Sequence, residues 1–201
     1  MEASIVIVGL GALGSHVALF MRNIKELKLV DFDKVDSHNI QSQFHTKLSL
    51  GRNKAQSISQ ALLGMFNVKA EAVPHKLTKD NVRALLQDPS PPGKRKEPWL
   101  VLDCTDNIEA RNLIQEYCLQ WHLPCLHGAL SADGSFSRVI WTEDFKADAE
   151  GDEGEATCID GEHLPFFGMA AAVMAVEAQN FLVTGKKRSY QLTPSGMTRL
   201  A

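Results

Sequence analysis

One segment near the amino terminus constrains the fold of this chain more than any other. Ser4–Val8 is a short run rich in β-branched residues, and the sequence Gly-Leu-Gly-Ala-Leu-Gly follows it directly at residues 9–14. Apolar residues then recur at helical spacing, at Leu13, Val17 and Phe20. A buried strand, a glycine-rich turn and a helix therefore follow one another without a break, which is typical of the first unit of a parallel sheet flanked by helices.

The three glycines of this turn have separate physical roles. Gly9 permits a tight turn, Gly11 lets the backbone approach a phosphate, and Gly14 lets the helix pack closely on the sheet. The helix amino terminus presents unpaired N–H groups to an anion. Asp31 follows at the end of the second predicted strand, where its carboxylate can accept hydrogen bonds from ribose hydroxyls. The alternative is a glycine turn without a ligand, but this context favours a nucleotide site.

The rest of the chain alternates between strands and helices. Further strands are expected at Leu27–Val30, Lys69–Val73, Trp99–Leu102, Pro124–Leu126 and Phe136–Trp141. Helices are expected at Ala12–Arg22, Lys54–Phe66, Lys79–Leu86, Ile108–Trp121 and Leu164–Val183. Asp33–Leu50 is expected to be a long functional loop with one turn of helix, Asp88–Glu97 a surface loop, and Ser189–Leu192 with Met197–Leu200 a closing hairpin. The fold class is therefore α/β, a Rossmann-like and mostly parallel sheet flanked by helices, with a C-terminal antiparallel hairpin, in one domain over residues 1–201.

Composition excludes several classes of protein. The 201 residues are 44% hydrophobic and 22% charged, which suits a globular core, and the net charge of -3 gives no electrostatic case for nucleic acid. Met1–Leu10 carries no basic residue and does not make a signal peptide, while the apolar stretch Leu164–Val176 is too short to span a bilayer. We therefore expect a cytoplasmic protein without a membrane partner.

Two further residues decide which nucleotide the site takes. A dehydrogenase needs neither a lysine nor a second acidic strand end near the phosphates, whereas an enzyme that splits a triphosphate needs both. Lys54 can neutralise phosphate charge, and Asp106 can hold Mg²⁺, which favours oxygen ligands. Taken singly, Lys54 could be an exposed lysine at a helix start and Asp106 an N-cap. Together with the glycine loop they favour Mg-ATP.

At this point the sequence resembles a family. The ordered motifs G-x-G-A-L-G-S, D-F-D-x-V, N-x-Q-x-Q, G-x-x-K-A and D-C-T-D-N-x-x-x-R are similar to those of the ThiF/MoeB/HesA family, the ubiquitin-activating-type adenylyltransferases. The resemblance implies adenylation of the C-terminal glycine carboxylate of a ubiquitin-like or sulfur-carrier protein, of the ThiS or MoaD kind, with release of pyrophosphate. It also implies a homodimer, or a heterodimer with a related subunit.

The same resemblance implies roles for individual residues. Lys54 would be the phosphate lysine, and Asp106 would be both a catalytic residue and the Mg²⁺ ligand. The residues it places around ATP and its phosphates are Gly9, Gly11, Gly14, Asp31, Asp33, Asn39, Gln43, Lys54, Asp106 and Asn107. The attacking carboxylate is already ionised, so the site must supply positioning and charge stabilisation rather than a general base.

The sequence departs from the family pattern in three ways, and the first two support an alternative function. Ser42 stands where members usually have an arginine, and Arg52 is a candidate substitute. The chain begins close to the first strand, without the N-terminal helix whose arginine often reaches the neighbouring subunit's site. It also lacks the paired CxxC motifs of many members, so no zinc is expected. The alternative is a non-catalytic nucleotide-binding or scaffolding subunit that pairs with an active partner; a weaker one is activation of a small carboxylate, as on a modified tRNA base.

The last candidate lies beside an acidic segment. Residues 143–155 carry seven acidic residues and one lysine, which predicts a solvated crossover loop at about residues 143–158. Cys158 matches a position that some ThiF-like proteins use for a covalent sulfur bond to the carrier. Its acidic neighbours would raise the thiol pKa rather than lower it, so a plain loop cysteine is the alternative. The other cysteines, Cys104, Cys118 and Cys125, are expected to be buried small apolar residues.

Overall fold

A single mixed sheet organises the computed structural model, which describes residues 1, 3–87, 99–131, 133–146 and 161–200. Its eight strands follow the order β3-β2-β1-β4-β5-β6-β7-β8. The strands are β1 (Ser4–Val8), β2 (Glu26–Val30), β3 (Glu71–Val73), β4 (Trp99–Asp103), β5 (Cys125–Leu130), β6 (Ser137–Trp141), β7 (Tyr190–Thr193) and β8 (Gly196–Arg199). The first five are parallel to one another, and β6, β7 and β8 continue the sheet antiparallel. The predicted fold class is confirmed.

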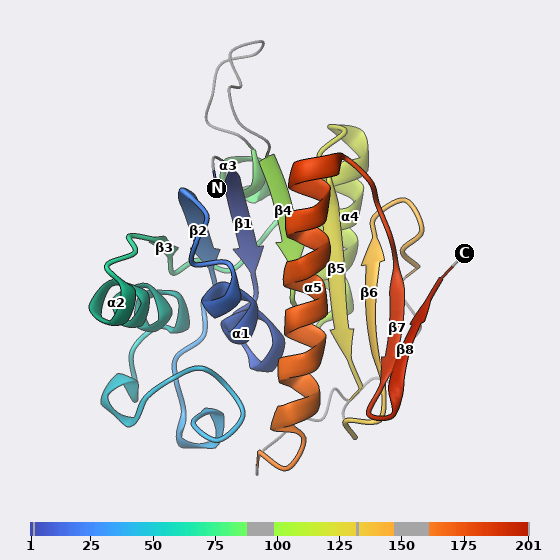
Figure 1. Ribbon diagram of the computed structural model, residues 1–201. Helices are drawn as coiled ribbons and strands as arrows, with labels where there is room; N and C mark the ends of the chain where they lie inside the picture. The colour runs from blue at the N-terminus through green and yellow to red at the C-terminus, as the bar shows by residue number, and fades with distance from the viewer. Residues whose placement is uncertain (2, 88–98, 132, 147–160, 201) are drawn as a thin grey trace.

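Helices cover both faces of this sheet. They are α1 (Ala12–Phe20), α2 (Lys54–Phe66), α3 (Val82–Leu86), α4 (Ile108–Gln120) and α5 (Leu164–Thr184), and the 3₁₀ turns are η1 (Ser37–Asn39) and η2 (Lys47–Ser49). Helices α1, α2 and α5 lie on one face, and α3 and α4 lie on the other (Figure 1). The loop after β2 therefore holds two helical turns where one was expected. The predicted helix at Lys79–Leu86 is shorter, the predicted strand at Pro124–Leu126 is longer, and the surface loop at Asp88–Glu97 lies outside the described residues.

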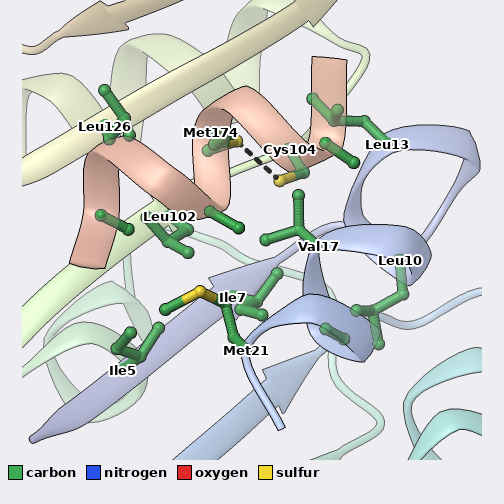
Figure 2. Packing of buried hydrophobic residues seen from close by; sticks show 14 of the residues in the cluster. Ile5, Ile7, Leu10, Leu13, Val17, Met21, Leu102, Cys104, Leu126 and Met174 are labelled. Carbon is green, nitrogen blue, oxygen red and sulfur yellow. Dashed lines mark hydrogen bonds between the residues drawn. The ribbon is translucent and has the colours of Figure 1, made fainter. Parts of the chain in front are cut away.

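Alternation along β1 shows how the core is divided. Ile5 and Ile7 face the cluster under α1 and α5, whereas Val6 and Val8 face the cluster under α3 and α4. Both faces are buried, so the strand reads as a continuous apolar run, as in parallel sheets generally. Figure 2 shows the first cluster, where side chains from β1, β4, β5, α1 and α5 interdigitate and the Cys104 thiol lies 3.7 Å from the sulfur of Met174.

Helix α5 corrects one of the sequence arguments. It extends over 21 residues, so by length and composition it could cross a membrane, and the argument that its apolar stretch is too short is wrong. Its packing explains the apolar sequence in another way. Phe167, Ala171, Met174 and Ala178 are buried against α1 and against the face of β5 and β6. The predicted buried helix at Leu164–Val183 is therefore confirmed.

Candidate nucleotide-binding site

The ends of β1, β2 and β4 meet at one edge of the sheet, where the arrowheads in Figure 1 point the same way. The Gly9 N–H donates to the Val30 carbonyl at 2.9 Å, and the Cys104 N–H donates to the Val8 carbonyl at 2.8 Å. Gly9 has a φ of +84°, and a Cβ there would lie 2.7 Å from the Cys104 carbonyl oxygen. Position 9 therefore requires glycine twice over, because of its backbone conformation and because the β4 end lies against it.

The other two glycines differ in their surroundings. A Cβ on Gly14 would lie 1.9 Å from the Gly9 carbonyl oxygen, so α1 rests directly on the loop. Gly11 is the N-cap of α1 and offers no side-chain cap, and a Cβ there would meet the Gln43 amide nitrogen at 4.0 Å and no closer described atom. The N–H groups at the start of α1 thus have no side-chain acceptor at the N-cap, which suits an anion.

Asp31 ties the end of β2 to the glycine loop. One carboxylate oxygen accepts from the Leu10 N–H at 2.6 Å and the other from the Asp33 N–H at 2.8 Å. Burial raises the pKa of Asp31, and the Lys54 charge and these two hydrogen bonds oppose that rise. Each oxygen keeps a second lone pair, so the carboxylate can still accept from a ribose hydroxyl.

Lys54 is buried at the first residue of α2, so the exposed-lysine alternative is wrong. Its N–H donates to the Asp33 carbonyl at 2.8 Å, and its Nζ lies 3.4 Å from Asp33 Oδ2. Asn53 caps α2 and also donates from Nδ2 to the carbonyls of Asp31 and Asp33. The ammonium is therefore held beside two aspartates, next to the glycine loop.

In the loop after β2, Asn39 was expected to lie along the phosphates, but its side-chain oxygen is used within the loop itself. Its Oδ1 accepts from the Asp36 N–H at 2.8 Å in a capping box, so this oxygen shapes the loop. Gln43 lies nearer the glycine loop, and its Oε1 is buried without a hydrogen-bond partner among the described residues. Ser42 is fully buried, and its Oγ is likewise unpartnered within those residues. The guanidinium of Arg52 donates to Gln60 at 2.7 Å, which directs it along α2 rather than toward this loop.

The end of β4 carries a buried polar chain. Asp103 accepts from the N–H and the hydroxyl of Thr105 at 2.9 and 2.7 Å, and its second oxygen lies 2.7 Å from His127 Nδ1. Burial by itself would raise the pKa of Asp103. The hydrogen bonds from His127 and Thr105, together with the charge of Arg111, hold this pKa below its usual value. Asp103 is therefore ionised at neutral pH.

Asp106 and Asn107 divide the roles that the sequence left open. Asn107, not Asp106, is the N-cap of α4, because its side chain accepts from the Ala110 N–H at 2.8 Å. The alternative of Asp106 as the cap is therefore wrong. Asp106 is exposed, and its carboxylate has no hydrogen bond or ion pair within the described part of the chain. In those residues no three His, Cys, Asp or Glu side chains cluster as a metal site, so a cation here would need oxygens from the nucleotide as well.

One residue that sequence reasoning missed holds the glycine loop from behind. His45 is buried, with Nε2 3.1 Å from the Leu10 carbonyl and Nδ1 3.2 Å from Ser57 Oγ. Burial lowers the pKa of His45 to about 4, so Nε2 carries the proton at neutral pH and donates it to Leu10. The neighbouring Phe44 N–H donates to Ser15 Oγ at 2.9 Å. A histidine two residues after the N-x-Q-x-Q motif was the available signal.

The cysteines fall into two groups. Cys104, Cys118 and Cys125 are buried and free, as predicted, and burial raises the pKa of Cys104 and Cys125 well above the usual thiol value. Cys158 and most of the acidic segment 143–158 lie outside the described residues.

Comparison with known proteins assigns the chain to a protein family. Residues 1–198 match the ThiF family. The chain is 30% identical over 190 residues to the molybdopterin-synthase adenylyltransferase of Salmonella typhimurium, covering 90% of this chain and 73% of that protein. It is 32% identical over 143 residues to the adenylyltransferase and sulfurtransferase MOCS3 of Anopheles gambiae, covering 68% of this chain and 30% of that protein.

Solved structures show the same fold. Escherichia coli MccB with succinimide superimposes with a TM-score of 0.75 at 16% identity, over 98% of this chain and 62% of MccB. MccB with ATP gives a TM-score of 0.73 at 15% identity, over 98% of this chain and 63% of that one. The chain thus spans less than two thirds of the length of these structures.

Proposed function

The chain belongs to the ThiF family, and on that premise we propose that it adenylates the C-terminal carboxylate of a small carrier protein, using Mg-ATP. The carrier would be a ubiquitin-like or sulfur-carrier protein ending in glycine. In this reaction a carboxylate oxygen bonds to the α-phosphorus of ATP, the bond from that phosphorus to the β-phosphate oxygen breaks, and pyrophosphate leaves with the electron pair. The names of the adenylyltransferase relatives support this reaction class.

One observation carries the proposal: Asp106 is an exposed carboxylate beside the glycine loop, and among the described residues it has no hydrogen bond or ion pair. It follows the β4 end, whose backbone lies against Gly9, while Asn107 performs the capping that would otherwise explain an acidic residue. Mg²⁺ is bound in nucleotide sites by one or two carboxylates plus phosphate oxygens, which fits a single free aspartate. When bound, the ion would neutralise charge developing on the pyrophosphate.

The remaining residues fit ATP in separate ways. The amino terminus of α1 has no side-chain cap, and Gln43 Oε1 has no hydrogen-bond partner among the described residues, so polar atoms are left for a ligand in this region. Lys54, held beside Asp31 and Asp33, would stabilise phosphate charge, and Asp31 would accept from the ribose. Asn39 and Asn107 would add side-chain nitrogens near the phosphates. No general base is required, because the attacking carboxylate is ionised at neutral pH.

The assembly around this reaction is part of the proposal. We expect residues 1–201 to act as one domain in the cytoplasm, as a homodimer or paired with a related subunit. We also expect the acidic segment at 143–158 to cross over the carrier tail, with Cys158 dispensable for adenylation.

Ser42 favours a second candidate, a nucleotide-binding subunit without activity of its own. It replaces the usual arginine and is fully buried, so an arginine could not occupy the same place without moving the loop. Arg52 points along α2 and does not replace it. In this case the protein would bind ATP and require a partner chain for adenylyl transfer.

Exchange of labelled pyrophosphate into ATP tests both candidates. With Mg²⁺ and candidate carriers added one at a time, the adenylyltransferase supports exchange only with its own carrier and only when the terminal carboxylate is free. An amidated carrier terminus is the matched control. Tight ATP binding without exchange, for any carrier, would favour the non-catalytic subunit, and tighter binding of NAD than of ATP would exclude both.

A further inference from the structure

A fully buried chain of polar side chains runs from β4 across β5 to the end of β6. Asp103 accepts from Thr105 with one oxygen and pairs with His127 Nδ1 at 2.7 Å with the other. On the far side of the ring, His127 Nε2 lies 3.0 Å from Thr142 Oγ1 and 3.5 Å from Cys125 Sγ. The side chains of Asp103 and His127 are 0% and 1% exposed, so neither can reach a substrate.

The far end of this chain fixes the segment that leaves β6. The ring of Phe145 stacks on His127 with centroids 4.1 Å apart and an interplanar angle of 8°. Gln115 on α4 donates from Nε2 to the carbonyls of Thr142 and Phe145 at 3.2 and 2.8 Å. Residues 142–145 are thus bound to the His127 ring on one side and to α4 on the other.

At its β4 end, this row of polar side chains lies next to Asp106, the candidate metal ligand. Asp103 holds the N–H and hydroxyl of Thr105, and Asp106 is the next residue. Because the Asp106 carboxylate has no hydrogen bond or ion pair within the described residues, its direction depends on the backbone that Thr105 anchors. Groups that bind the supports of a metal ligand commonly set its orientation and affinity.

We propose that His127 is a positioning residue, which orients Asp106 for the metal through Asp103 and Thr105 and links this loop to residues 142–145 through Thr142. The inference rests on the proposed function, because it requires Asp106 to hold Mg²⁺ with ATP. The ligand at Asp106 is a divalent cation bound together with nucleotide phosphates. The segment linked to this site through His127 is residues 142–145, which leave β6.

A purely structural role is the rival explanation, since the same contacts bind β4, β5 and β6 together. Two substitutions of His127, each of which keeps one of its two hydrogen bonds, distinguish the positioning role from the structural role. His127→Asn keeps a nitrogen near the Nδ1 position, so the bond to Asp103 survives and the bond to Thr142 is lost. His127→Gln places a nitrogen near the Nε2 position, so the bond to Thr142 survives and the bond to Asp103 is lost. A structural role predicts similar losses in both variants.

The measurement is the affinity for ATP by calorimetry, with Mg²⁺ and with a chelator. We expect His127→Gln to reduce the gain in affinity that Mg²⁺ gives by at least ~10-fold. His127→Asn should retain that gain, and both variants should bind metal-free ATP as the wild type does. Glu177→Gln is the matched control, because it removes a partly buried ion pair, to Arg188 at 3.1 Å, and leaves the Asp103–His127–Thr142 contacts intact.

A second measurement, hydrogen exchange at residues 142–145, does not depend on a change in ligand affinity. In the wild type, Mg-ATP should slow hydrogen exchange of the amides at 142–145, and Thr142→Val should abolish that slowing while keeping the gain in affinity. This variant also tests the inference if His127→Gln fails to fold. Equal loss in the two His127 variants, loss in neither, or slowed exchange in Thr142→Val would overturn the inference. A wild type whose ATP affinity ignores Mg²⁺ would instead overturn the proposed metal role of Asp106, and the inference with it.

Discussion

The ends of β2 and β4 are built on the same plan. Each begins with a buried aspartate, Asp31 or Asp103, and each continues with an exposed aspartate, Asp33 or Asp106. In both places the buried carboxylate organises the backbone of the loop that follows it. The carboxylate exposed to solvent is therefore the second of each pair.

The two ends differ in what holds the buried carboxylate. Asp31 accepts from two backbone N–H groups and keeps a raised pKa because burial dominates. Asp103 is held by the side chains of His127 and Thr105, and its pKa is lowered. Backbone donors are supplied by almost any sequence that makes the turn, whereas side-chain donors require particular residues on a neighbouring strand. The β4 end should therefore be the more sensitive to substitution.

The largest difference is expected between the buried aspartates. Asp103→Asn removes a charge that His127 and Arg111 compensate, which costs about 3 kcal/mol in the free energy of unfolding. Asp31→Asn loses one acceptor but also removes the cost of a buried charge, so we expect about 1 kcal/mol. Urea denaturation of both variants measures the difference. Equal losses would show that backbone and side-chain donors hold these carboxylates equally well.

Activity should separate the exposed aspartates. Asp106→Asn should lower pyrophosphate exchange at least ~100-fold, because it removes the metal ligand and with it the stabilisation of transition-state charge. Asp33→Asn should lower exchange less than ~10-fold, since its carboxylate makes a partly exposed ion pair. Neither change should lower the thermal midpoint, because both side chains are exposed. A fall in exchange that is larger for Asp33→Asn would reverse the proposed roles.

The helix caps after the two ends give a smaller contrast. Asn53→Ala removes the cap of α2 and two further bonds to the carbonyls of Asp31 and Asp33, so we expect a loss of about 2 kcal/mol. Asn107→Ala removes the cap of α4 alone, for a loss of about 1 kcal/mol. Chemical denaturation measures both, and Asn107→Asp, which keeps a capping oxygen, is the control. A greater loss in Asn107→Ala would contradict the comparison.

The smallest effect is a pH dependence that differs between the two ends. His45 supports the glycine loop next to β2, and its pKa is about 4 in the folded protein against 6.5 for the free side chain. The unfolded chain binds more protons between these values, so stability falls as pH falls, by about 1 kcal/mol from pH 6.5 to 5.5. Asp103 acts at lower pH, because a lowered pKa stabilises the fold above pH 3.8 and this contribution is lost as pH falls further.

Substitution separates these two contributions. His45→Gln should remove the fall between pH 6.5 and 5.5 and keep the fall below pH 3.8. Asp103→Asn should do the opposite. Denaturation curves across this pH range measure both, and an unchanged profile in His45→Gln would show that another group titrates there.

Most of the fold was predictable from local patterns in the sequence. β1 and α2 have the predicted bounds, because a β-branched run, a capping asparagine and helical periodicity act over a few residues. The lengths of α3 and β5 were not predicted, since neighbouring elements decide where a short helix or strand ends. The role of α5 was predicted correctly, although its length defeated the argument against a membrane span.

The candidate site divides in the same way. The sequence alone determined the glycine turn, Lys54 at the start of α2 and the two strand-end motifs, because sterics, capping and strand–helix order are local properties. Only the tertiary structure decided that His45 supports the loop and that His127 pairs with Asp103. The last pair is 24 residues apart in the chain and meets because β4 and β5 are neighbours in the sheet. Strand order is a property of the whole molecule, and no short segment of sequence specifies which side chains it brings together.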